Sequence, residues 1–198
     1  MSAIQGLAFK FNELFVSDNE AFYATPGCFG SLVDVDFLID HKGKSLANTE
    51  KDFLLHSGDE ALVFRAYFFN EWFCKQVSDH TDELTSYFAV STGFTITKAT
   101  TIECDGIPVK IILEAKLREL SLLNTAPVVD TSYARIVSDE TCGSLADDYQ
   151  RIITVGRYVN LHRKALAADN DGVIEHKHIA SSYDAAANRF VRTLAALA

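Results

Sequence analysis

The sequence contains no apolar run long enough to cross a membrane. Its most apolar stretch, residues 61–77, is interrupted by Arg65, Asn70, Glu71 and Lys75, whereas a membrane span needs roughly 18 apolar residues. The first residues lack a basic segment followed by an apolar one, so no secretory signal is expected. These absences predict a soluble, cytoplasmic protein without a membrane partner, or a particle assembled in the cytoplasm.

Proline, glycine and cysteine are also scarce. Three Pro and ten Gly among 198 residues argue against long disordered segments. The four cysteines, Cys28, Cys74, Cys104 and Cys142, include no Cys-x-x-Cys pair. We therefore expect buried, reduced thiols in place of a zinc site or a disulfide framework.

Basic residues are outnumbered, and the net charge is −9. This sign opposes unspecific binding to nucleic acid or anionic membrane, because both are polyanions. The apolar fraction of 48%, with fourteen Phe residues, is sufficient for a packed core. The length fits one domain, or one domain with an appended helical unit.

The clearest local pattern is a long β-hairpin. Asp105-Gly106 is a favoured two-residue turn, and it lies between two alternating segments at 94–104 and 107–117. One face of the second segment is expected to carry Ile107, Val109, Ile111, Leu113, Ala115 and Leu117. Further strands are predicted at 7–11, 33–40 and 128–137, with a turn over 42–45.

Three helices are predicted as well. Ser57 and Glu60 have the spacing of a capping box, and apolar residues follow at helical spacing up to Val77. The second helix is expected to begin after Ser144, with two acids in its first turn. Its main apolar face comprises Leu145, Tyr149, Ile152, Ile153, Gly156 and Val159. A third amphipathic helix, from about Ile179 to Leu197, is predicted to close the chain.

Together these elements predict an α+β fold. An antiparallel β-rich body (1–140), with the long hairpin and a mid-chain helix, precedes a C-terminal two-helix unit (141–198) within one compact domain. This order of strands and helices resembles that of the coat proteins of single-stranded RNA bacteriophages, in which the helices of two subunits pack over each other's sheet. The resemblance concerns architecture alone, because this chain is longer and far more acidic than an RNA-lining shell requires.

No catalytic or nucleotide motif passes a strict test. Residues 43–45 imitate the end of a phosphate-binding loop, but Leu38 stands where its first glycine belongs. His56 and His80 each precede a hydroxyl residue and then acids, which is typical of helix caps. His176 and His178 flank Lys177, and polarity at the start of a helix explains them better than zinc binding does. The sequence predicts no cofactor.

Two alternatives remain open. The polar face of the hairpin could contact phosphates through four basic residues, Lys98, Lys110, Lys116 and Arg118. A strand at 33–40 would place three carboxylates, Asp34, Asp36 and Asp40, on one face, where they could hold a divalent cation in an enzyme.

The leading interpretation is a non-enzymatic structural subunit that self-associates into a larger assembly, of which a virus-type or phage-type particle is one example. Its partners would be copies of itself and other assembly proteins, not nucleic acid. The helix after Ser144 carries a second apolar strip, opposite its main face, formed by Tyr158, Leu161 and Ala165. A single sheet buries only the broader face, so this strip is the predicted oligomer interface.

Overall fold

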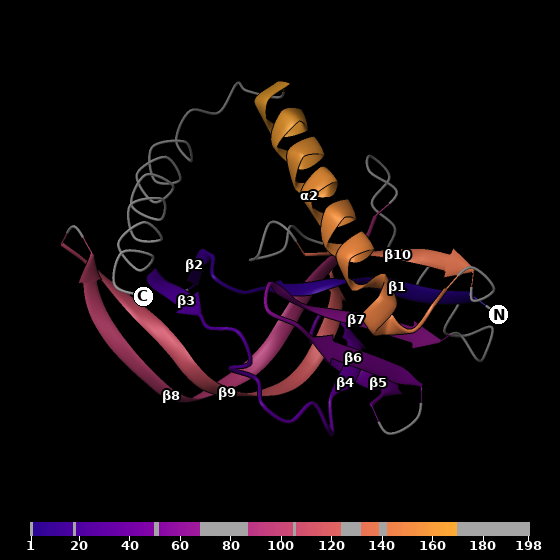
Figure 1. Cartoon of the computed structure of the whole chain (residues 1–198), viewed down its shortest axis with the longest axis horizontal. Helices are drawn as coiled ribbons and strands as arrows, with labels where there is room; N and C mark the ends of the chain where they lie inside the picture. The colour runs from indigo at the N-terminus through magenta and orange to yellow at the C-terminus, as the bar shows by residue number, and fades with distance from the viewer. Residues whose placement is uncertain are drawn as a thin grey trace.

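The computed structural model describes residues 2–17, 19–49, 52–67, 87–104, 106–123, 132–138 and 142–169. In this part of the chain, strands form two sheets and one helix follows them (Figure 1). Sheet A is antiparallel, in the order β10 (Tyr133–Ser138), β1 (Ser2–Lys10), β7 (Ala61–Tyr67) and β6 (Phe53–Ser57). The β-rich, mainly antiparallel class that the sequence predicts is confirmed.

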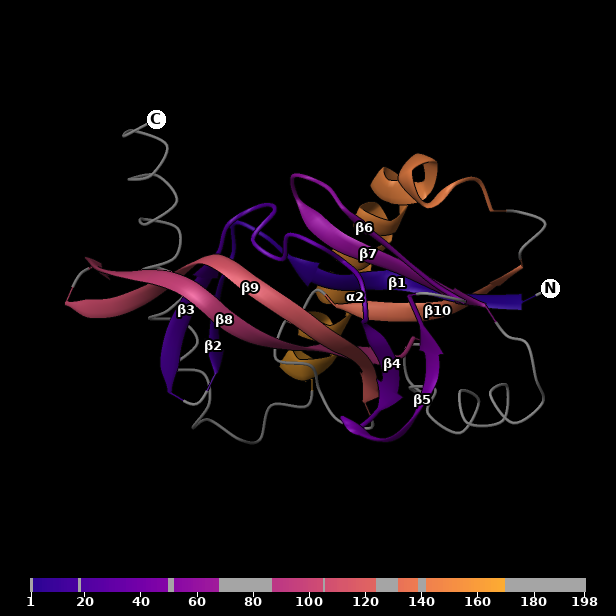
Figure 2. The same cartoon turned by 90° about the horizontal axis from the view of Figure 1, so that it is seen from below.

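Sheet B is organised around its longest strand. Its order is β2 (Leu14–Ser17), β3 (Glu20–Ala24), β9 (Ile107–Leu123), β4 (Asp36–Ile39) and β5 (Lys42–Asn48), and β8 (Ala89–Cys104) also pairs with β9. Strand β3 pairs in parallel with residues 109–112 of β9, and β4 pairs in parallel with residues 119–122. Strand β8 runs antiparallel to β9 along nearly its whole length. Figures 1 and 2 show the β8–β9 hairpin extending beyond sheet A.

Sheet A is covered on both faces. One face packs against sheet B in the main core, where Phe37, Phe53 and Phe64 lie with ring centroids 5.3 to 6.0 Å apart. The other face packs against α2 (Leu145–Asp169) through a second cluster that includes Val63 and Tyr133. The molecule is therefore layered as helix, sheet A and sheet B (Figure 1).

Burial in the main core suppresses ionisation of Cys28. The side chain is 3% exposed, and burial raises the pKa of its thiol from 9.0 to about 11. Between these two pH values the unfolded chain releases a proton that the folded chain retains. The contribution of Cys28 to the free energy of unfolding is therefore fully present below pH 9. It falls between pH 9 and 11 by up to about 1.4 kcal/mol per pH unit.

Urea denaturation of the wild type and of Cys28→Ala at pH 8, 9.5 and 10.5 measures this loss. The wild type is expected to lose stability more steeply with rising pH than the variant. Equal slopes would show that Cys28 does not contribute.

The predicted hairpin is confirmed, together with its turn. Cys104 pairs with Ile107, which leaves two residues between the strands, and Gly106 has a φ of 79°. Because a β-branched residue is strained at this φ, Gly106→Val is expected to lower the free energy of unfolding by about 1 kcal/mol or more. Urea denaturation measures the loss, and Gly106→Asn is the control because Asn tolerates positive φ. Equal losses in both variants would contradict the turn.

The predicted apolar face of the hairpin is wrong beyond Ile111, because β-bulges change the alternation. Thr97 in β8, and Leu113 and Arg118 in β9, have no partner in the ladder. Each bulge shifts the side chains that follow it to the other face. The residues of β9 that enter the main core are consequently Ile112, Ala115, Leu117, Leu120 and Leu122, and Leu113 is 38% exposed. Ile107, Val109 and Ile111 belong to a separate cluster with Ala21 and Tyr23.

The predicted mid-chain helix is wrong where the structure describes it. Ser57 ends β6 and pairs with Leu62 in β7, so it caps no helix. Strand β7 lies between β1 and β6 and is buried on both faces, so its residues form an apolar run that contains Arg65 and shows no alternation. Such a run has the same composition as a buried helix, which explains the error. Residues 68–77 of the predicted helix lie outside the described residues.

The strand expected over 33–40 and the turn expected over 42–45 are both displaced. Strand β4 begins only at Asp36, and Val33 is 60% exposed in the preceding loop. The turn occupies Asp40 and His41, since Ile39 pairs with Lys42, and β5 already covers residues 42–45. Both turn residues have positive φ, at 47° and 59°, as a two-residue hairpin requires. The turn was not predicted at these two positions because neither residue is glycine.

The C-terminal part agrees with expectation as far as it is described. Strand β10 overlaps the strand predicted at 128–137 and ends one residue beyond it; the first four residues of the prediction lie outside the described part. Helix α2 begins after Ser144 as predicted, whereas the predicted last helix lies wholly outside the described residues. Within the described part, no helix is long and apolar enough to cross a membrane.

Candidate functional site

Helix α2 has one buried face and one exposed face. Ser144 caps it, because the Oγ atom accepts a hydrogen bond from the Asp147 backbone N at 3.2 Å. The predicted main face is buried, at Leu145, Tyr149, Ile152, Ile153, Gly156 and Val159. On the opposite side, Tyr158 is 69% exposed and Leu161 is 64% exposed. We call the predicted interface residues Tyr158, Leu161 and Ala165 the outer strip. The side chain of Ala165 lies outside the description.

Arg65 fixes the start of α2 against sheet A. Its buried guanidinium donates to Asp148 Oδ2 at 2.6 Å, to the Gly143 carbonyl at 2.8 Å, and to Gln5 Oε1 at 2.5 and 2.8 Å. Arg65 is 2% exposed and Asp148 is 8% exposed, so the ion pair is shielded from water. This contact determines which side of the helix faces the sheet.

Two tyrosines hold the same face down. The Tyr149 hydroxyl accepts backbone hydrogen bonds from Glu60 at 2.9 Å and Ala61 at 2.8 Å, in the loop that enters β7. The Tyr133 hydroxyl donates to the Ile152 carbonyl at 2.8 Å, and burial raises the pKa of this hydroxyl above its usual value. With this face held by sheet A, the outer strip is directed away from the body of the molecule.

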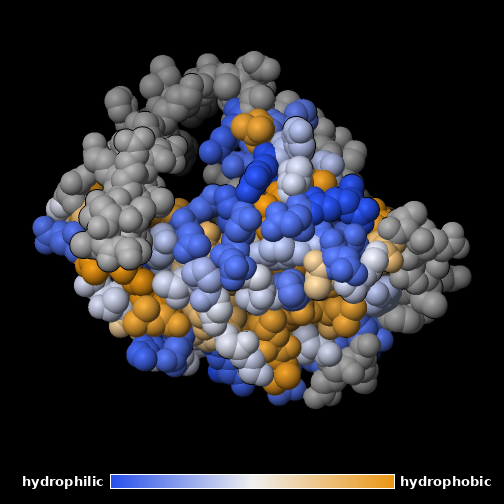
Figure 3. Space-filling model, viewed as in Figure 1, coloured by the Kyte–Doolittle hydropathy of each residue, from blue (hydrophilic) through white to orange (hydrophobic). Residues whose placement is uncertain are grey.

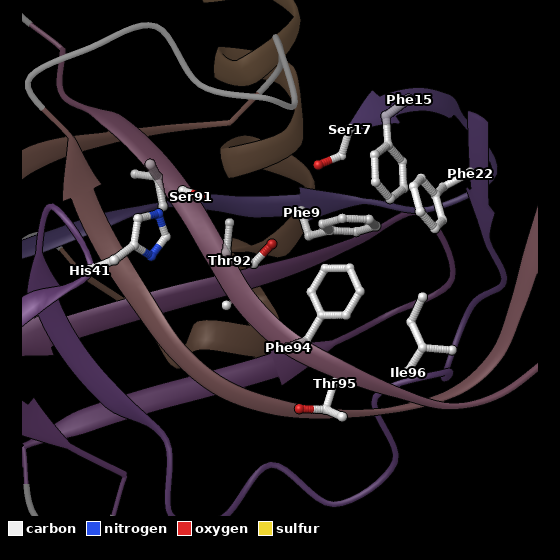
Figure 4. A pocket seen from close by; sticks show the side chains of 13 residues that line it. Phe9, Phe15, Ser17, Phe22, His41, Ser91, Thr92, Phe94, Thr95 and Ile96 are labelled. Atoms are coloured by element: carbon white, nitrogen blue, oxygen red, sulfur yellow. The ribbon is translucent and has the colours of Figure 1, made fainter. Parts of the chain in front are cut away.

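A second candidate site is a cavity of about 600 Å³ between β8 and the strands β1, β2 and β3, which we call the aromatic pocket. Its described lining combines apolar and polar residues: Ala8, Phe9, Phe15, Ser17, Phe22, His41, Val90, Ser91, Thr92, Gly93, Phe94, Thr95 and Ile96. Figure 4 shows the phenylalanine rings and Ile96 at one end of the pocket, and His41 beside Ser91 at the other.

The aromatic end is built from packed rings. Phe15 stacks on Phe22 with centroids 5.4 Å apart, and Phe9 meets both Phe15 and Phe94 edge-on at 5.3 and 6.0 Å. These separations suit stacked and edge-to-face aromatic pairs. The rings come from four strands, so the fold of both sheets is needed to assemble this wall.

His41 is held at the polar end by three contacts to β9. Its Nδ1 atom lies 2.5 Å from Glu119 Oε1, its backbone N donates to Ser121 Oγ at 3.1 Å, and Asp40 N donates to the Leu122 carbonyl at 2.9 Å. The Ser121 hydroxyl in turn donates to Glu119 Oε2 at 2.5 Å. A carboxylate only accepts hydrogen bonds, so Nδ1 carries a proton and donates this hydrogen bond, and Nε2 is left outside the contact.

Gly93 makes room for this arrangement. A Cβ atom at Gly93 would lie 2.1 Å from Glu119 Oε1, so a larger residue would displace the carboxylate that orients His41.

Ser121, Glu119 and His41 contact one another in the order serine, glutamate, histidine, with glutamate in the middle. A nucleophilic serine requires histidine in that place, so these three residues do not form a hydrolytic triad.

The four basic residues of the predicted nucleic-acid face do not gather into one patch. Lys98 pairs with Glu114 at 3.1 Å, and Lys110 pairs with Glu20 at 2.9 Å. Lys110 also lies 5.2 Å from the Phe22 ring, on the face of sheet B opposite Lys98 and Lys116. Arg118 is exposed at a bulge. The nucleic-acid interface therefore stays a prediction, and the positions of these four basic residues do not support it.

The predicted carboxylate site is also dispersed. Of the three aspartates only Asp36 lies in β4, where it accepts a hydrogen bond from Asn48 Nδ2 at 3.2 Å. Asp34 precedes the strand with a φ of 54°, and Asp40 lies in the turn that follows it. Within the described ranges, no three His, Cys, Asp or Glu residues are placed to hold a metal ion.

The helix cap predicted at His56-Ser57 is wrong. His56 lies in β6, and its ring meets the Tyr149 ring edge-on, with centroids 5.4 Å apart. His80, His176 and His178 lie outside the described residues.

Sequence reasoning missed the aromatic pocket. Its lining residues are separated by up to 88 positions, from Ala8 to Ile96, and no motif links them. One local signal was present, because Asp40-His41 followed by Lys42-Gly43 is rich in turn-forming residues. A turn predicted at residues 40–41 in place of 42–45 would have singled out His41. Its contact with Glu119 could still not have been predicted, because it depends on the pairing of β4 with β9.

The comparisons with known proteins add no relative: no family model, no curated protein and no solved structure matches this chain.

Proposed function

We propose that the chain is a non-enzymatic structural subunit that self-associates through the outer strip of α2. The observation that carries this proposal is the exposure of Tyr158 and Leu161, at 69% and 64%, on a helix whose other face is buried. Figure 3 shows an apolar spot on the upper half of α2, with hydrophilic residues beside and below it. Large apolar groups within a polar surround are typical of contact surfaces between proteins.

The occupant that fits the strip best is α2 of a second copy in antiparallel orientation. Antiparallel packing about the strip would place Tyr158 of each helix beside Leu161 of its partner, so that the two exposed apolar side chains cover each other. It would also oppose the two helix dipoles, which is favourable.

The strip alone gives a weak contact. Burying a tyrosine and a leucine would contribute on the order of 3 kcal/mol per copy, at about 25 cal/mol per Å² of apolar area. Association costs about 4–15 kcal/mol in lost translational and rotational freedom. Further surface must therefore join the contact, and the projecting β8–β9 hairpin supplies it. A closed or particle-like assembly would repeat such contacts many times.

Leu161→Asp tests the proposal, because it places a charge in the centre of the strip at a side chain that is 64% exposed. The variant is expected to have a lower oligomeric state than the wild type on a sizing column, with an unchanged far-UV circular dichroism spectrum. Val33→Asp is the matched control, since Val33 is equally exposed, at 60%, but lies in the loop before β4. An identical effect of both variants, or no effect of Leu161→Asp, would contradict the role of the strip.

A further inference from the structure

We propose that the aromatic pocket binds a neutral amphipathic small molecule that has a flat, ring-containing apolar body and one hydroxyl group. This site is separate from the outer strip, and it does not depend on self-association. The volume of about 600 Å³ lies within the range of roughly 300–1,000 Å³ that is usual for small-molecule sites.

The apolar end determines the body of the ligand. Phe9, Phe15, Phe22 and Phe94 bring four rings to one end, joined there by Ile96 (Figure 4). Aromatic faces and edges favour a flat ring system, because stacked and edge-to-face contacts add to simple apolar burial. No Asp, Glu, Lys or Arg side chain is among the described lining residues, so an ionic body would lose its hydration without compensation.

The polar end determines the functional group. Glu119 occupies Nδ1 of His41, and within the described residues Nε2 has no hydrogen-bond partner. Nε2 is therefore the ring atom left to exchange a hydrogen bond with a ligand hydroxyl, which can both donate and accept. Ser91 lies beside His41 in the pocket, and its hydroxyl can satisfy the ligand oxygen.

The backbone at this site supports the assignment. Asp40 and His41 have positive φ because they form the two-residue turn between β4 and β5, and this turn places His41 in the pocket wall. In addition, the seven consecutive residues from Val90 to Ile96 line the pocket, although they alternate between the two faces of β8. The pocket therefore follows the edge of β8 that does not pair with β9. The peptide groups along this edge of β8 offer further polar contacts.

Titration with 2-naphthol, followed by the fluorescence of the probe, tests the proposal, with naphthalene as the matched probe without a hydroxyl. The wild type is expected to bind one 2-naphthol per chain, at least 10-fold more tightly than naphthalene. His41→Asn keeps a residue that tolerates positive φ and removes the imidazole ring with its Nε2 atom. It should reduce this preference to less than 3-fold while leaving naphthalene binding unchanged.

Two further variants locate the binding. Thr92→Phe is compatible with a strand and fills the pocket, so it should weaken both probes by 10-fold or more. Leu161→Asp lies on the outer strip and should leave both unchanged, whatever its effect on assembly. Absence of saturable 2-naphthol binding, or unchanged binding in Thr92→Phe, would overturn the site. Equal binding of both probes to the wild type would overturn the hydroxyl assignment.

Discussion

Asp148→Ala is expected to lower the free energy of unfolding by about 3–5 kcal/mol. The substitution leaves the guanidinium of Arg65 buried without its counter-ion, and an uncompensated buried charge is among the costliest defects in a protein. The polar oxygens of Gln5 and Gly143 would remain beside it, but neither carries a charge. Urea denaturation followed by circular dichroism measures the loss.

Asp147→Ala is the control for this prediction. Asp147 is the neighbouring acid in the same first turn, but it is exposed, so its loss should cost about 1 kcal/mol or less. Arg65→Met removes the buried charge itself and is expected to cost less than Asp148→Ala, because Asp148 keeps Arg151 at 2.8 Å. A loss below 1 kcal/mol in Asp148→Ala would show that Arg65 is not anchored as described.

Phe64→Ala is expected to cost about 3–5 kcal/mol as well, for a different reason. Phe64 is fully buried, and its ring lies 5.7 Å from Phe37 in sheet B and 6.0 Å from Phe53 in sheet A. Removing the ring leaves a cavity where the two sheets meet, and the rigid strands around it cannot collapse into the space.

The matched control is Leu54→Ala in the neighbouring strand β6. Leu54 is 43% exposed, so its truncation should cost less than about 1 kcal/mol in the same denaturation experiment. Similar losses in the two variants would mean that the Phe37–Phe53–Phe64 cluster does not hold the sheets together.

Features with a local cause could be predicted from the sequence. The turn at Gly106 requires positive φ, and the capped helix after Ser144 has a 3.6-residue apolar period, so both are encoded within a few residues. The exposure of Tyr158 and Leu161 followed from the same period, because a helix on a sheet can bury only one broad face.

Features with a non-local cause could not be predicted in this way. Strand β7 resembles a helix in composition, and only its place between β1 and β6 makes it a strand. The bulges at Leu113 and Arg118 are invisible in the alternation, yet they decide which residues of β9 enter the core. The aromatic pocket depends on both sheets and on the contact between His41 and Glu119, residues 78 positions apart.

The central claim is that copies of this chain associate through α2, and sedimentation equilibrium of the wild type at tens of micromolar tests it most directly. We expect a mass that is a multiple of 21.9 kDa and falls towards 21.9 kDa on dilution and in Leu161→Asp. A wild-type mass of 21.9 kDa at every concentration would contradict the claim and leave Tyr158 and Leu161 as ordinary surface residues.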